Sequence, residues 1–214
     1  MSLYHGGTWM DPSAPGHSFW LNFFCDLLHD HALDGAPNSA GARLATLAML
    51  ALIAGMLPFW LATASLVSAR PTLAWTVRIA GVTSVVGLVA VPLTPSDRFG
   101  ALHGVAVLVA AVPGLVANAC ATIGLLANRD GARRWTRGLG VLALATFVSA
   151  AIDAALYAKQ MAGAGAVTPP ALPALQKIAA MLFVAWMLGT GRRCAKKKDG
   201  RPTLPMRATP GAPS

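Results

Sequence analysis

Five long apolar segments constrain this 214-residue chain more than any other feature. They cover residues 44–69, 72–94, 101–127, 138–158 and 171–190. A helix needs ~20 residues to cross a hydrocarbon core of ~30 Å, and every segment reaches that length. Alternation of apolar and polar residues, which a membrane barrel requires, is absent. With 55% hydrophobic and 12% charged residues, the sequence predicts an all-α integral membrane bundle of five transmembrane helices.

The basic residues lie between the apolar segments in a pattern that indicates orientation. A net charge of +9 is also found in nucleic-acid-binding proteins, but here the cations form short clusters. Arg70 and Arg78 flank the first connection, four arginines fill the third, and RRCAKKK follows the fifth segment. Such clusters are typical of cytoplasmic loops. We therefore expect a cytoplasmic C-terminus, a place in the bacterial cytoplasmic (inner) membrane, and no nucleic-acid partner.

Polar side chains gather on the opposite side of the predicted topology. All eight acids are aspartates, and all but Asp130 and Asp199 fall on the extracytoplasmic side together with every histidine. The cations alone set the topology, so this segregation is a separate observation. It predicts a polar pocket at the extracytoplasmic face. The candidate residues are Cys25, Asp26, His29, Asp97, His103, Asp153 and Lys177.

Asp153 is the most informative of these residues because it lies inside an apolar segment. A carboxylate deep in a membrane helix costs ~2.5–3.5 kcal/mol on insertion scales, and such residues usually face a partner inside the bundle. Lys177, near the outer end of the fifth segment, is a plausible partner. The alternative is that both side chains extend to nearby water.

The segment SFWLNFFCDLLHDH, residues 18–31, places aromatic and leucine side chains at helical spacing. It is too short to span, so we expect a short interfacial amphipathic helix. The predicted organisation is an extracytoplasmic segment over 1–40, a transmembrane domain over 41–191, and a basic, disordered cytoplasmic tail over 192–214.

A metal site is an alternative interpretation of the same groups. Cys25 and His29 are four residues apart, so one helical face could present both, and His103 could complete a zinc site. Zinc lowers the pKa of bound water to ~7, which would support hydrolysis. No metal motif of high specificity is present, and a structural, hydrogen-bonded rim explains the same residues. The three cysteines are too dispersed in this topology to pair, so we expect no disulfide within the chain.

Two groups of residues resemble a known family. The first contains Gly6-Gly7, Asn22 and Cys25-Asp26-Leu27; the second contains Pro95, Asp97 and His103. This pattern resembles the bacterial multi-pass membrane family catalogued as domain of unknown function 998. The resemblance implies six helices, the first ending just before the Gly-Gly turn, so that this chain would lack that helix and the true start would lie upstream.

The best-supported function is that of a multi-pass integral membrane protein without an assigned reaction. Its partners are the lipid bilayer and, through the polar pocket, a lipid ligand. The alternative function is a metal-dependent membrane hydrolase that acts on a lipid or its head group. Transport is less favoured because few charged groups lie near the middle of the predicted membrane helices.

Overall fold

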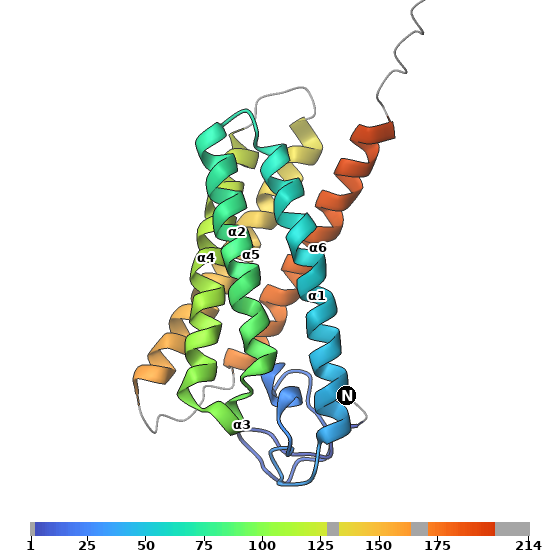
Figure 1. Cartoon of the computed structure of the whole chain (residues 1–214), viewed down its shortest axis with the longest axis vertical. Helices are drawn as coiled ribbons and strands as arrows, with labels where there is room; N and C mark the ends of the chain where they lie inside the picture. The colour runs from blue at the N-terminus through green and yellow to red at the C-terminus, as the bar shows by residue number, and fades with distance from the viewer. Residues whose placement is uncertain (1–2, 128–132, 164–170, 200–214) are drawn as a thin grey trace, which may run out of the picture.

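The computed structural model describes residues 3–127, 133–163 and 171–199, and over these residues it is a helical bundle without strands (Figure 1). Five long helices are joined by short connections, with a 3-10 turn and a single helical turn near one end. Their bounds are η1 Cys25–Leu28, α1 Ser39–Leu66, α2 Pro71–Leu93, α3 Ser96–Phe99, α4 Ala101–Leu126, α5 Arg133–Ala162 and α6 Ala171–Asp199. The prediction of an all-α bundle is confirmed.

All five long helices are long and apolar enough to cross a membrane. Their most apolar windows have mean hydropathies between 1.6 and 2.1, yet at most 33% of any window is buried inside the bundle. Most of the apolar surface therefore points outward, which is the arrangement expected of helices that face the lipid of a membrane. The chain is a multi-pass membrane protein, and the five predicted spans correspond to these helices.

The centre of the bundle is an aromatic cluster between α1 and α6. Phe59 and Trp60 on α1 meet Phe183 and Trp186 on α6, with ring centroids 4.9–6.1 Å apart. Most of these pairs are edge-to-face, the arrangement that the ring quadrupole favours. Gly81 on α2 makes room for this cluster, because a Cβ there would lie 2.5 Å from Trp60.

Helices α2 and α4 pack along their length (Figure 1). A Cβ on Gly87 would come within 2.9 Å of the backbone of Ala110, so the glycine permits close approach of the two helices. Beside it, the Ser84 hydroxyl donates a 2.7 Å hydrogen bond to the carbonyl of Ala110. Close packing at a small residue and one interhelical hydrogen bond thus hold α2 and α4 together.

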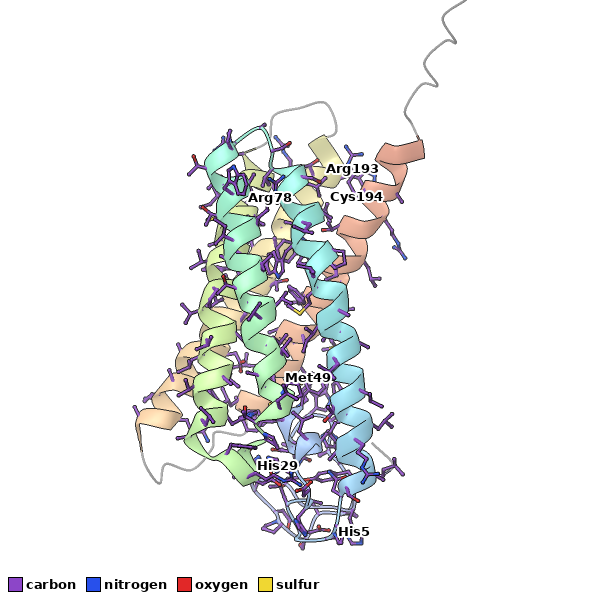
Figure 2. All side chains as sticks on the ribbon, in the orientation of Figure 1. His5, His29, Met49, Arg78, Arg193 and Cys194 are labelled. Atoms are coloured by element: carbon purple, nitrogen blue, oxygen red, sulfur yellow. The ribbon has the colours of Figure 1, made fainter. Side chains whose placement is uncertain are left out.

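The two ends of the bundle differ in chemistry. One end, here called the cap end, carries the N-terminal cap, residues 3–38, together with α3. The other, the basic end, carries the connection after α1 and the last turns of α6. Figure 2 shows His5 and His29 at the cap end and Arg78 and Arg193 at the basic end.

Two predicted boundaries differ from the structure. The amphipathic helix expected over 18–31 is reduced to η1, because the side chains of Asn22 and Asp26 bond to the backbone of Ser18 and Phe23 and so compete with helical hydrogen bonds. The helix α6 continues to Asp199, so the tail predicted to begin at 192 is helical at its start. Residues 200–214 lie outside the described residues.

Candidate functional site

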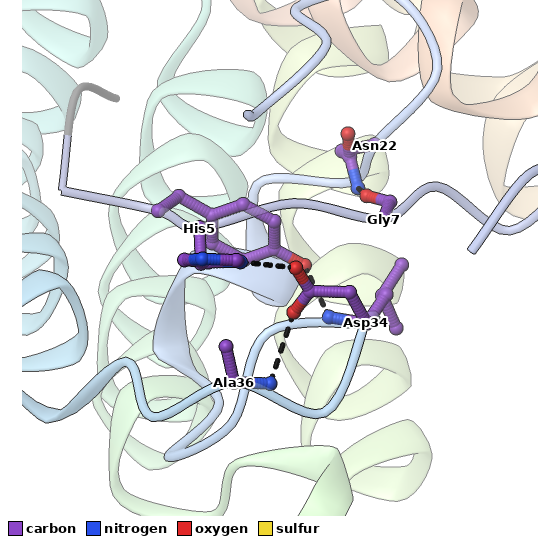
Figure 3. Close-up of polar contacts among 7 residues, drawn as sticks. His5, Gly7, Asn22, Asp34 and Ala36 are labelled. Carbon is purple, nitrogen blue, oxygen red and sulfur yellow. Dashed lines mark hydrogen bonds and ion pairs between the residues drawn. The ribbon is translucent and has the colours of Figure 1, made fainter. Parts of the chain in front are cut away.

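The cap is a folded loop structure held by local contacts. Tyr4 lies almost fully inside it, and its hydroxyl accepts a 2.9 Å hydrogen bond from the Leu33 amide. Gly7 has φ +90° and leaves no room for a Cβ against Asp34, so the turn needs glycine here. Figure 3 shows the Asp34 carboxylate accepting hydrogen bonds from His5, at 2.5 Å, and from the Ala36 amide, at 3.0 Å.

Asp26 is the centre of the cap and is only 2% exposed. Its carboxylate accepts hydrogen bonds from the Phe23 amide at 2.7 Å, the Trp9 indole at 3.1 Å and the Asn22 amide group at 3.4 Å. Burial raises the pKa of Asp26, while these donors act in the opposite direction. All of these partners donate hydrogen bonds to the carboxylate oxygens, and such donors favour the ionised form of Asp26.

Asn22, which is fully buried, links the cap to the bundle. Its side-chain oxygen accepts a hydrogen bond from the Ser18 amide at 2.9 Å. Its side-chain nitrogen donates to the Gly7 carbonyl at 2.9 Å, and Figure 3 shows these two residues facing each other. Its backbone carbonyl accepts a hydrogen bond from the ammonium group of Lys177 on α6. One asparagine therefore orders two parts of the cap and anchors them to a transmembrane helix.

Lys177 is fully buried below the cap. Its ammonium group lies 4.5 Å from the centre of the Phe24 ring, a cation–π distance. The neighbouring Gln176 accepts a 2.9 Å hydrogen bond from the Phe24 amide. Lys177 interacts electrostatically with Asp26, Cys25 and Asp153, which places all four groups in one neighbourhood.

The other side of the cap docks on α3. The His29 ring lies 2.7 Å from the Ser96 hydroxyl, and the Asp30 amide donates a 2.8 Å hydrogen bond to Asp97. The Asp30 carboxylate forms an ion pair with Arg98. Asp97, which belongs to α3, therefore helps to attach the cap to this helix.

His103 stands at the start of α4, only 4% exposed. Its Nδ1 lies 2.8 Å from the Thr94 carbonyl, which fixes the proton on that nitrogen. It is close enough to His29 and Asp26 for electrostatic interaction, but its Nδ1 hydrogen bond is to Thr94 and not to Asp26 or Asp97.

Asp153 differs from the other acids of the site. It lies on α5, half-buried, and among the described residues it has no hydrogen bond and no ion pair. The expected pairing with Lys177 is electrostatic rather than a direct contact, because Lys177 donates to Asn22 instead. Tyr157, one turn further along α5, interacts with both Asp153 and Cys25.

Two further groups in this region are neutral. Burial raises the pKa of the Cys25 thiol to about 12, and the nearby Asp26 charge adds to the effect. His17, near Lys177, has a pKa lowered chiefly by burial, and its ring packs edge-on against the Tyr4 ring. A protonated thiol is a poor nucleophile and a poor metal ligand.

The predicted site residues thus form two connected groups. Cys25, Asp26 and Asp153 interact electrostatically with Lys177. His29 and His103 are hydrogen-bonded to Ser96 and Thr94, beside α3, and Asp97 bonds to the cap at Asp30. The candidate pocket predicted from the sequence did not include Asn22, Ser96 or His17. Asn22 has a detectable signal, a polar residue within an aromatic run, whereas the roles of Ser96 and His17 depend on contacts across the fold.

The zinc interpretation stays a prediction. In the part of the chain that the structure describes, no three His, Cys, Asp or Glu side chains are placed to hold a metal ion. All three cysteines are free, as expected.

No protein family, curated protein or solved structure matches this chain. Its function must therefore be inferred from the residues of the site.

Proposed function

We propose that this protein spans the bacterial cytoplasmic membrane with the cap outside, and that it binds the head group of a membrane phospholipid at Asp153. The orientation is supported by the cations. Arg70, Arg192 and Arg193 belong to the basic end, and Lys- and Arg-rich connections remain in the cytoplasm. Residues with the family resemblance, among them Asn22, Asp26 and Asp97, also hold the cap, which supports membership of that family as part of the proposal.

The single observation that carries the binding proposal is the unpaired carboxylate of Asp153. An ionisable group in a membrane helix is costly and normally has a partner. Asp153 has no hydrogen bond or ion pair among the described residues, only a longer-range electrostatic interaction with Lys177. It lies within the apolar span Trp135–Gln160, about 10 Å from the end of that span at 1.5 Å per residue. This depth is close to the head groups of the outer leaflet.

The charge balance of the site indicates what kind of group would bind. With both carboxylates ionised, Asp26 and Asp153 carry two negative charges against the one positive charge of Lys177, and the Cys25 thiol is protonated. One negative charge is left over. A cationic amine would balance it, and the primary amine of phosphatidylethanolamine can also donate hydrogen bonds to Asp153.

The test is native mass spectrometry of the protein purified in mild detergent with added phosphatidylethanolamine. We expect the wild type to retain the lipid and Asp153→Asn to lose most of it. Asp11→Asn is the matched control, because Asp11 is an exposed cap residue and its replacement should leave binding unchanged. Equal retention by wild type and Asp153→Asn would refute the binding proposal.

The orientation is tested separately. We expect a cysteine introduced at the exposed Met10 to react with a membrane-impermeant maleimide in intact cells, whereas Cys194 should react only after lysis. If Cys194 reacts in intact cells, the proposed orientation is wrong.

A further inference from the structure

A hollow on the outer surface between α2 and α4 lies far from the cap. It has a volume of about 670 Å³ and is lined by Thr72, Trp75, Thr76, Ile79, Val112 and Val116, among others. The walls are almost entirely apolar. The hydroxyls of Thr76 and Thr83 bond to carbonyls of their own helix, so they need no polar ligand.

The length and position of this α2–α4 groove match one leaflet of a membrane. On α2 it runs from Thr72, in the first turn at the basic end, to Thr83. Eleven residues at 1.5 Å each cover about 16 Å, roughly half of a hydrocarbon core of ~30 Å. The groove therefore begins at head-group level and ends near the middle of the membrane, as the acyl chain of a lipid in that leaflet does.

An arginine without an acidic partner among the described residues stands at the rim of the groove. The Arg78 guanidinium lies 5.2 Å from the centre of the Trp75 ring, which is one wall of the groove. The ion pairs found in the described part of the chain are His5–Asp34 and Arg98–Asp30, both at the cap end. Arg78 is half-buried inside a transmembrane helix (Figure 2), where a counter-charge is needed.

We propose that the α2–α4 groove holds an acyl chain of an anionic phospholipid from the basic-end leaflet, with its phosphate bound to Arg78. Basic sites between transmembrane helices on the cytoplasmic side suit anionic head groups. A guanidinium binds phosphate oxygens through two parallel hydrogen bonds, and stacking on Trp75 holds it in place. The groove supplies the apolar part of the lipid site, and Arg78 supplies the selectivity for charge.

The experiment offers the purified protein equal amounts of phosphatidylglycerol and phosphatidylethanolamine with identical acyl chains, and native mass spectrometry measures the bound ratio. Arg78→Gln should reduce retained phosphatidylglycerol about fivefold, since one basic residue near the surface contributes roughly 1 kcal/mol. Arg43→Gln removes the same charge near the start of α1, at the cap end, and should have no effect.

A second variant tests the groove itself. Val112→Trp fills the hollow with a larger side chain at a position that is 57% exposed, and it should displace the lipid without disturbing the core. Val141→Trp on α5, at a position 60% exposed outside the groove, is the matched control. Unchanged phosphatidylglycerol in Arg78→Gln and Val112→Trp, or an altered oligomeric state of Val112→Trp without lipid loss, would overturn the inference. Asp153→Asn should leave this site intact, so the two lipid proposals can fail separately.

Discussion

The ammonium group of Lys177 on α6 donates a hydrogen bond to the backbone carbonyl of Asn22, a residue 155 positions earlier in the chain. This contact attaches the cap to a transmembrane helix at a point where both residues are fully buried. The same cation also neutralises part of the charge on Asp26 and Asp153. Lys177 therefore couples the fold of the cap to the packing of the bundle.

Replacement of this cation should loosen the cap. In Lys177→Met, the Asn22 carbonyl loses its hydrogen-bond donor, and Asp26 loses a nearby positive charge. Removal of one partner of a buried charge interaction lowers the free energy of unfolding by about 3 kcal/mol. We expect faster protease cleavage within residues 3–38 and a lower free energy of unfolding. Lys159→Met is the control, because Lys159 is exposed on α5 at the same end. Cleavage at the wild-type rate in Lys177→Met would show that the cap is held by other contacts.

Cys25 should be chemically inert at neutral pH. Its pKa is raised to about 12 by burial and by Asp26. At pH 7.5 its thiolate fraction is therefore roughly a thousandfold smaller than that of a thiol with a pKa of ~8.5. Maleimide should therefore label Cys25 in detergent at least ~100-fold more slowly than a cysteine at the exposed position of Met10. Comparable labelling rates, measured by mass spectrometry, would contradict the raised pKa of Cys25.

The contact of His5 with Asp34 should make the cap sensitive to acid. The hydrogen bond from His5 is the main cause that lowers the pKa of Asp34. A lowered pKa stabilises the folded cap at every pH above the unfolded value of ~3.9, and this stabilisation disappears as pH falls through the folded pKa. Asp34→Asn should therefore speed amide hydrogen exchange in the cap at pH 7 but have little effect at pH 2, relative to wild type. An equal difference at both pH values would exclude this ionisation as the cause.

Close packing of α2 on α4 should not tolerate a methyl group at Gly87. The added Cβ would lie 2.9 Å from backbone atoms of Val109 and Ala110, which cannot rotate away, and overpacking of this kind costs about 1–3 kcal/mol. We expect Gly87→Ala to lower the thermal unfolding midpoint in detergent. Gly138→Ala on α5 meets nothing within 4 Å and should be neutral or slightly stabilising. A similar midpoint for both variants would mean that the helices can separate at Gly87.

The membrane spans could be predicted from the sequence because hydropathy is a local property. Each of the five apolar runs reaches the length that crosses a bilayer, and a long apolar segment has few alternatives to a helix. Thus residues 101–127 were expected to span and α4 is Ala101–Leu126. The separation of cations from histidines and aspartates also follows from chain order once the helices alternate in direction. The order of residues along the chain is therefore enough to establish the class of protein and its two chemically distinct ends.

The partners of the polar groups depend instead on how the helices pack. The candidate set contained Asp26, Asp153 and Lys177, but it paired Lys177 with Asp153, whereas the ammonium group bonds to Asn22. Likewise, the aromatic periodicity of residues 18–31 predicted a helix, and Asn22 and Asp26 bond to nearby backbone amides instead. Hydropathy carries no information on such contacts, because they depend on angles and distances between side chains from separate elements. Each buried polar group takes the partner that the packed helices bring within reach.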